Sequence, residues 1–132
     1  MIVYEHASGS VQDLFLSKSS NKGWKPPKAL ALSWCHQLLT GLSYLHTLAC
    51  PFAHRDIKPA NLLISEDLQS LKLADFSCAA PMVREIDLPP ISGSPRYMAP
   101  EIVAREPYSL VKADVFSATI CCWCLVLGDR PF

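Results

Sequence analysis

The sequence has no excess of either charge. Its 132 residues include 12 Lys and Arg and 12 Asp and Glu, so the formal net charge is zero. A chain without net charge has no overall field to attract a polyanion. We therefore expect neither nucleic acid nor an anionic membrane surface among its partners.

The sequence also lacks a cysteine pattern typical of a metal site. Of its six cysteines, Cys121, Cys122 and Cys124 crowd one apolar run, and the other three are scattered. Cysteines in an apolar helix more often act as small core residues than as zinc ligands. We expect reduced thiols, as in a cytoplasmic or nuclear protein.

Signals for secretion or membrane insertion are missing as well. The N-terminus has no basic region leading into an apolar stretch, and the apolar run 115–127 is thirteen residues long. A membrane-spanning helix needs about 20 apolar residues. We expect no signal peptide and no transmembrane segment.

What the chain does contain is enough apolar material for a core, since 50% of its residues are hydrophobic and 18% are charged. Residues 30–48 form the clearest amphipathic stretch, and a shorter helix is expected from Val11 to Phe15. Apolar residues recur at three- and four-residue steps in the longer stretch, which predicts that they form its buried face: Leu32, Cys35, Leu38, Leu39, Leu42 and Leu45.

A third helix is predicted over the apolar run 115–127. It is apolar on every side, as buried helices are, and Gly128 is a plausible terminator. Asp114 precedes the run, where a carboxylate is suited to cap the helix, to brace another backbone segment, or to do both.

Two short extended runs, residues 62–64 and 71–73, flank a polar connection and predict a β-hairpin. A hairpin brings Asn61 and Asp75 to adjacent ends of the two strands. Carboxylate and amide oxygens are suitable ligands for a hard divalent cation. The pattern therefore favours a shared metal site at this end of the hairpin.

Three motifs occur in order along the chain: His-Arg-Asp-Ile-Lys-Pro-Ala-Asn at 54–61, Asp-Phe-Ser at 75–77 and Met-Ala-Pro-Glu at 98–101. Each alone is weak, because a lone Asp-Phe-Ser is more often a turn. In this order and spacing they resemble the C-terminal lobe of a protein kinase.

This resemblance implies an α+β fold of the kinase C-lobe type, mainly α-helical with a small β-hairpin, and most of the N-lobe missing. Residues 1–10 would be the end of the N-lobe and the hinge, and residues 11–132 the C-lobe through its central helix. A Gly-rich loop, a strand lysine and its glutamate partner would precede residue 1 in a complete kinase domain.

The resemblance also implies roles for individual residues in an ATP- and Mg²⁺-dependent kinase. Asp56 would be the catalytic base, and Asn61 and Asp75 would be Mg²⁺ ligands. Lys58 would stabilise charge on the transferring phosphoryl group, and its position is typical of kinases that act on serine and threonine. Protein substrates with such hydroxyls are the expected partners.

The adenine would contact the hinge backbone near Glu5 and Ala7, with Leu63 beneath it. Arg55 would pair with a phosphorylated activation segment, which makes an upstream activating kinase a further expected partner. The remaining residues with implied regulatory or structural roles are His54, Phe76, Ser92 as a candidate phosphosite, Ser94, Glu101 and Asp114.

Two features depart from the commonest family pattern. Ser77 stands where the family usually has glycine, and the seven residues between His46 and His54 resemble a tyrosine-kinase-like or Raf-like subgroup. The leading interpretation is a fragment of a protein serine/threonine kinase. The alternatives are a pseudokinase-like module that binds partner proteins and an inactive truncated gene product.

Overall fold

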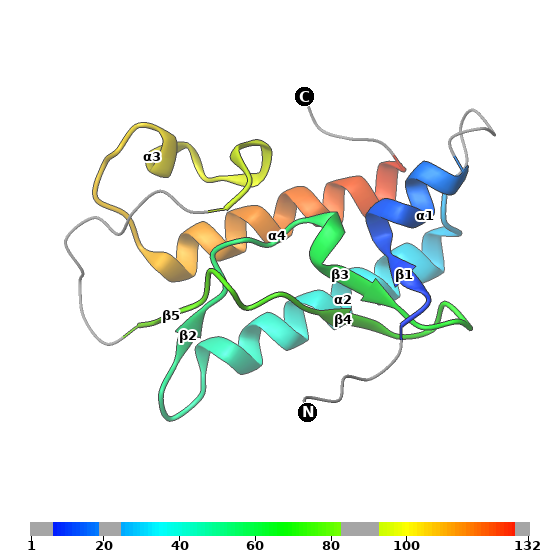
Figure 1. The fold of residues 1–132 in the computed structure, drawn as a ribbon, viewed down its shortest axis with the longest axis horizontal. Helices are drawn as coiled ribbons and strands as arrows, with labels where there is room; N and C mark the ends of the chain where they lie inside the picture. The colour runs from blue at the N-terminus through cyan, green and yellow to red at the C-terminus, as the bar shows by residue number, and fades with distance from the viewer. Residues whose placement is uncertain (1–6, 19–24, 83–92, 129–132) are drawn as a thin grey trace.

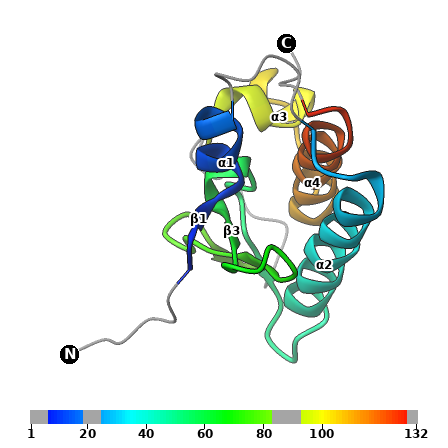
Figure 2. The ribbon, with the colours of Figure 1, turned by 90° about the vertical axis from the view of Figure 1, so that its right-hand side faces the viewer.

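Two long antiparallel helices form one layer of the molecule, and short strands and loops form the other. A computed structural model describes residues 7–18, 25–82 and 93–128 (Figure 1). Helices α2 (Lys28–His46) and α4 (Leu110–Leu127) pack against each other. Seen end-on, they lie opposite β1 (Gly9–Ser10), β3 (Leu62–Ile64) and α1 (Val11–Lys18) (Figure 2). The predicted α+β class is confirmed.

The predicted hairpin is the centre of a small sheet. β3 pairs antiparallel with β4 (Leu71–Leu73), with Leu62 opposite Leu73, and β1 adds to the other edge of β3. A second sheet, which the sequence did not predict, joins β2 (Phe52–Ala53) to β5 (Ala80–Pro81). The hairpin therefore sets the positions of the segments at both of its ends.

The first helix begins with a reciprocal cap. The Ser10 backbone N–H and hydroxyl both donate to Asp13 Oδ2, at 2.9 and 2.7 Å, and Asp13 N–H donates back to Ser10 Oγ at 3.1 Å. These bonds satisfy N–H groups that a helix start leaves without partners. They also lower the pKa of the Asp13 carboxyl below its ordinary value of 3.8.

The buried face of α2 differs from the predicted one. Leu32 and Leu39 are 51% and 45% exposed, so their assignment to the core was wrong. The helix packs on β4 as well as on α4, and this turns a different stripe inward. The buried residues are Ala31, Trp34, Cys35, Leu38 and Leu42.

Helix α4 begins earlier than predicted, at Leu110, with Ser109 Oγ accepting the Lys112 N–H at 3.4 Å. Asp114 lies inside the helix, so the prediction that it caps the helix was wrong. Gly128 ends the helix in the left-handed region at φ 70°, a conformation that favours glycine, as predicted.

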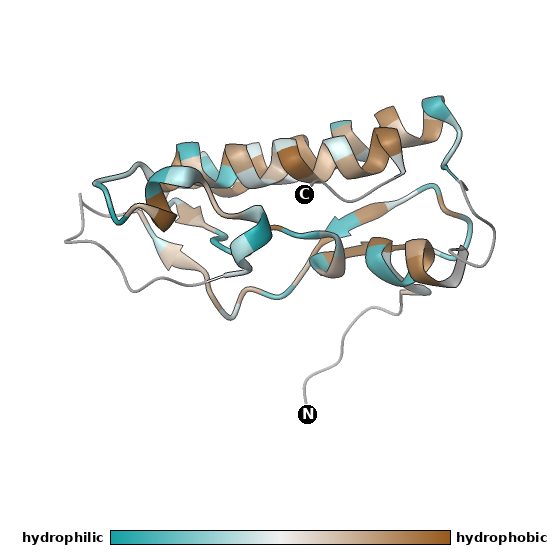
Figure 3. Cartoon of the chain, turned by 90° about the horizontal axis from the view of Figure 1, so that it is seen from above, coloured by the Kyte–Doolittle hydropathy of each residue, from teal (hydrophilic) through white to brown (hydrophobic). Residues whose placement is uncertain are grey.

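One side of α4 is exposed, which corrects the prediction of a helix buried all round. Ala118, Cys121 and Leu125 are fully buried, whereas Val115 and Trp123 are 45% and 53% exposed. Its 18 residues are long and apolar enough to cross a membrane, by length and composition alone. Within the fold, however, α4 packs against α2. Figure 3 colours the ribbon by hydropathy and shows many hydrophobic residues along the long helices.

Shorter elements complete the described chain: the 3₁₀ turns η1 (Pro59–Asn61) and η2 (Pro95–Tyr97), and α3 (Pro100–Val103). The predicted activation segment, from Asp75 to Glu101, thus has only short elements where it is described: β5, η2 and the start of α3. Residues 1–6, which include Glu5 of the predicted hinge, lie outside the described residues.

Replacing Leu38 by alanine should destabilise the fold by about 2–5 kcal/mol, because the side chain is 1% exposed and its loss leaves a cavity. Its neighbour provides the matched control: Leu39→Ala should change the free energy of unfolding by no more than about 0.5 kcal/mol. Urea denaturation measures both. Equal effects would contradict the assigned buried face.

Replacing Ser10 by alanine should raise the pKa of Asp13 toward its ordinary value, because the hydroxyl bond favours the charged carboxylate. A lowered folded-state pKa means that ionised Asp13 stabilises the fold above the ordinary pKa. That contribution disappears as pH falls through the folded-state pKa. An NMR pH titration of the Asp13 carboxyl carbon checks this. An unchanged midpoint would contradict it, and Ser43→Ala is the control.

Candidate active site

A buried carboxylate on α4 holds the segment that carries the first motif. Asp114 is 1% exposed. Its Oδ2 accepts the His54 N–H at 2.7 Å and His46 Nε2–H at 2.9 Å, and its Oδ1 accepts the Arg55 N–H at 2.8 Å. The brace predicted for Asp114 is therefore present in the structure. The third donor, His46, comes from α2 and was not predicted.

Arg55 needs this support, since its backbone lies at φ 66°. The left-handed region costs a residue with a Cβ about 1–2 kcal/mol. The two backbone hydrogen bonds to Asp114 hold the chain in this conformation. This strained turn immediately precedes Asp56.

His54 links this turn to the hairpin. Its fully buried ring contacts the Ala74 carbonyl oxygen through Nε2 at 3.0 Å, and its Nδ1 accepts the Asp56 N–H at 3.3 Å. The tautomer with its proton on Nε2 satisfies both contacts. The Phe76 ring lies 5.0 Å away, centroid to centroid. One side chain thus positions the loop before β3 against the segment after β4.

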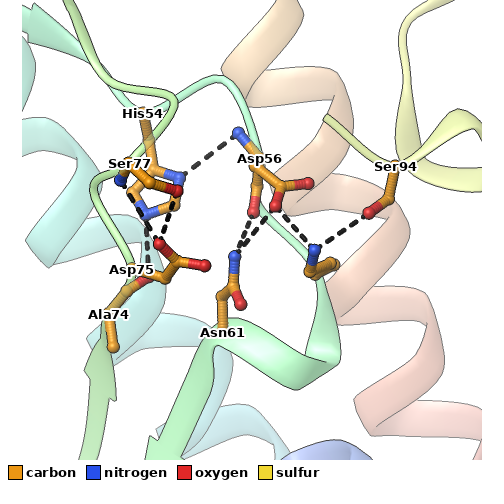
Figure 4. Close-up of polar contacts among 8 residues, drawn as sticks. His54, Asp56, Asn61, Ala74, Asp75, Ser77 and Ser94 are labelled. Atoms are coloured by element: carbon orange, nitrogen blue, oxygen red, sulfur yellow. Dashed lines mark hydrogen bonds and ion pairs between the residues drawn. The ribbon is translucent and has the colours of Figure 1, made fainter. Parts of the chain in front are cut away.

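The carboxylate of Asp56 has two oxygens in different environments. Oδ2 accepts Lys58 Nζ at 2.6 Å and Asn61 Nδ2 at 3.2 Å, and the same Asn61 amide also donates to the Asp56 carbonyl oxygen at 2.9 Å (Figure 4). Oδ1 is buried and has no hydrogen-bond partner among the described residues. Such an atom is an acceptor without a donor, which folded proteins rarely keep without a role.

Gly93 explains how a second segment approaches this carboxylate. Its φ is 107°, and a Cβ placed on it would lie 2.5 Å from the Arg55 carbonyl oxygen and 3.4 Å from Asp56 Oδ1. Only glycine fits there. The close approach places Ser94 next to Lys58, and Ser94 Oγ accepts a hydrogen bond from Lys58 Nζ at 3.0 Å. No role for Gly93 was predicted from the sequence.

The segment after Ser94 is anchored to α4. Ser117 Oγ donates to the Tyr97 carbonyl oxygen at 2.7 Å. Ser117, like His46, is a positioning residue that sequence reasoning missed. Its place one turn after Asp114 is the only sequence signal, and it becomes informative once α4 is known to begin at Leu110.

Asp75 follows β4 and lies at the same end of the hairpin as Asn61, as predicted. Ala74 N–H donates to the Asn61 carbonyl oxygen at 2.9 Å. Asp75 Oδ1 accepts the Ser77 hydroxyl at 2.7 Å and the Ser77 N–H at 3.3 Å. These bonds, with a smaller contribution from the charge of Lys58, lower the pKa of Asp75.

The remaining predicted residues are less closely connected to this cluster. Ala7 and Leu63 are partly buried, and Leu63 alternates with Leu62 and Ile64, which face the core. Glu101 makes no ion pair with any residue that the structure describes. Glu5 and Ser92 lie outside the described residues.

A sequence model of the protein kinase domain matches residues 1–132. The chain belongs to the protein kinase family. The motifs that characterise the family therefore supply the cluster: the first motif carries Asp56, Lys58 and Asn61, the Asp-Phe-Ser motif carries Asp75, and Ser94 lies shortly before the Met-Ala-Pro-Glu motif.

Relatives among curated proteins carry serine/threonine kinase names. The chain is 36% identical to the probable serine/threonine-protein kinase HSL1 of Saccharomyces cerevisiae, over 99% of the chain and 8% of that protein. It is 39% identical to the serine/threonine-protein kinase ATG1a of Arabidopsis thaliana, over 99% of the chain and 20% of that protein. For CBL-interacting protein kinase 26 of Oryza sativa subsp. japonica the identity is 38%, over 98% of the chain and 25% of that protein.

The chain thus spans a quarter or less of the length of these relatives. Their names agree with the serine/threonine assignment of the kinase. The tyrosine-kinase-like or Raf-like subgroup stays a prediction, as do the domain boundaries at residues 10 and 11.

Replacing Asp114 by asparagine should destabilise the kinase fold by about 1–3 kcal/mol for each buried donor left unpaired, because an amide has only one acceptor oxygen. Urea denaturation measures the loss. Glu106→Gln, an exposed carboxylate in the preceding loop, is the matched control and should have little effect. Equal stabilities of the Asp114→Asn variant and the parent chain would contradict the brace.

Proposed function

We propose that this chain supplies the catalytic loop of a protein kinase that transfers the γ-phosphoryl group of ATP to serine and threonine hydroxyls of proteins. The observation that carries the proposal is the asymmetry of Asp56. Two donors hold its Oδ2, and its Oδ1 is left without a donor. A substrate hydroxyl is the donor that would complete it.

In this mechanism Asp56 Oδ1 accepts the proton of the attacking hydroxyl and orients it toward the phosphorus. Lys58 is held beside Asp56 by its 2.6 Å contact, where its ammonium opposes the negative charge of the transferring group. Ser94 accepts a hydrogen bond from the same ammonium. The activation segment therefore contacts the catalytic loop through a group that the chemistry uses.

The donor set fits Mg²⁺. Asn61 uses its amide nitrogen on Asp56, which leaves its amide oxygen for a cation, and Asp75 offers a carboxylate at the same end of the hairpin. Mg²⁺ typically takes one or two protein oxygens, with phosphates and water completing its shell. Among the described residues no cluster of three His, Cys, Asp or Glu forms a denser metal site. When bound, Mg²⁺ would neutralise charge on the ATP phosphates.

The adenine site is proposed from the backbone near Glu5 and Ala7 together with Leu63. Ser8 N–H and Oγ both donate to the Ile64 carbonyl oxygen, at 3.0 and 2.8 Å. The segment that follows Ala7 is thereby held alongside β3. This contact supports a hinge that passes beside the strand carrying Leu63.

Protein substrates, an upstream activating kinase acting on Ser92, and a cytoplasmic or nuclear location are further proposals. Arg55 next to the catalytic aspartate is the feature that favours control by phosphorylation. The zero net charge gives no support to nucleic acid or an anionic membrane surface as a partner. A pseudokinase-like binding module is less favoured, because Asp56, Asn61 and Asp75 are all present.

Mg²⁺-ATP should raise the thermal unfolding midpoint of the chain, because a ligand that binds only the folded state stabilises it. At a concentration 100 times its Kd the gain is about 2.7 kcal/mol. Removing the metal with a chelator, or replacing Asp75 by alanine, should abolish the shift. Asp67→Ala, in the exposed hairpin turn, is the control that should keep it. A shift that survives in Asp75→Ala would contradict the proposed metal site, and no shift in the parent chain would contradict a nucleotide site in it.

A further inference from the structure

Ser77 is the departure from the family pattern that the function described so far leaves without a role. In the common Asp-Phe-Gly form this position has no side chain. Here the Ser77 hydroxyl donates to Asp75 Oδ1 at 2.7 Å, and its N–H donates to the same oxygen at 3.3 Å. One oxygen of the metal-ligand carboxylate is therefore engaged twice by a single residue.

The second carboxylate oxygen of Asp75, Oδ2, faces a different direction. Figure 4 shows it on the side of the carboxylate that faces Asn61 and Asp56, away from Ser77. The base of this side chain is also fixed, because Ala74 N–H is bonded to the Asn61 carbonyl oxygen and the Ala74 carbonyl oxygen to His54. Ser77 thus restrains the carboxylate of Asp75, which the surrounding backbone contacts leave free to rotate.

We propose that the Ser77 hydroxyl is a positioning group that keeps Asp75 Oδ1 engaged, so that Asp75 binds Mg²⁺ through Oδ2 alone. The inference rests on the proposed function, since it concerns the metal ligand of that site. A carboxylate without such a partner can rotate and can present both oxygens to a cation. Each carboxylate oxygen has about two acceptor sites, and on Oδ1 both are met by Ser77 donors, the hydroxyl and the N–H. This disfavours coordination through Oδ1 and orients Oδ2.

The role is local, because Asp75 and Ser77 are both exposed. Removing an exposed hydroxyl should leave the thermal unfolding midpoint unchanged within error. The orientation of Asp75 and the affinity for metal should change instead. This combination separates positioning from a structural role.

The first test needs no ligand. Three-bond NMR couplings from the backbone nitrogen and carbonyl carbon of Asp75 to its Cγ report the χ1 rotamer. We expect a single rotamer in the parent chain and in Ser77→Thr, which keeps the hydroxyl. Ser77→Ala, which removes only the hydroxyl, should give averaged couplings. A single rotamer retained in Ser77→Ala would overturn the proposal.

The second test measures Mn²⁺ binding by electron paramagnetic resonance in the presence of ADP, with Mn²⁺ as the probe for the Mg²⁺ site. Loss of a partner that orients a metal ligand typically weakens binding about 10–100-fold, so Ser77→Ala should bind Mn²⁺ at least about 10-fold more weakly. Ser77→Thr should stay close to the parent chain. Unchanged or tighter binding in Ser77→Ala would overturn the proposal.

The two tests separate this inference from the function on which it rests. If the parent chain binds no Mn²⁺ with ADP, the proposed metal site fails, and with it the one-oxygen ligation. The couplings then still decide whether Ser77 orients Asp75. If Mn²⁺ binds and Ser77→Ala changes neither the couplings nor the affinity, only the inference about Ser77 fails.

Discussion

The buried carboxylate of Asp114 is the contact on which the rest of the site depends. It joins three parts of the chain that are distant in sequence: α4, the end of α2 at His46, and the turn at His54 and Arg55. A buried charge is costly unless donors surround it, and here all three donors come from the segments that must be held together. The same requirement that stabilises the charge therefore fixes the strained turn that precedes Asp56.

From that turn the site is built by short-range contacts. His54 connects the catalytic loop to the segment after β4, and Lys58 connects it to the activation segment at Ser94. Asn61 closes the loop on Asp56 and leaves one oxygen of that carboxylate unpartnered. In the proposed function that oxygen is the one a substrate hydroxyl would meet. In the proposed function such preorganisation would assist phosphoryl transfer, in which the protein does little covalent chemistry.

The sequence predicted the elements that depend on local pattern. The hairpin bounds at 62–64 and 71–73 were right, because short, mainly apolar runs flank a polar turn. The prediction of the buried face of α2 was wrong at Leu32 and Leu39. The packing of α2 against both α4 and β4 buries Trp34 instead, and the sequence of α2 alone does not reveal that packing. The start of α4 was predicted about one turn too late, after Asp114, because helix periodicity does not fix where a helix begins. The two-residue strands β2 and β5 form only through their mutual pairing.

Gly93 and His46 act through contacts with residues far along the chain, which no local pattern reveals.

Hydrogen exchange of the His54 and Arg55 backbone amides, followed by NMR, tests the central role of Asp114 most directly. Both amides donate to a carboxylate that is 1% exposed, so they should exchange only through global unfolding, as the most protected amides of α2 and α4 do. The amide of Gln69, bonded to Asp67 in the exposed hairpin turn, should exchange far faster. If the His54 and Arg55 amides exchanged as fast as that of Gln69, Asp114 would not be holding the catalytic loop.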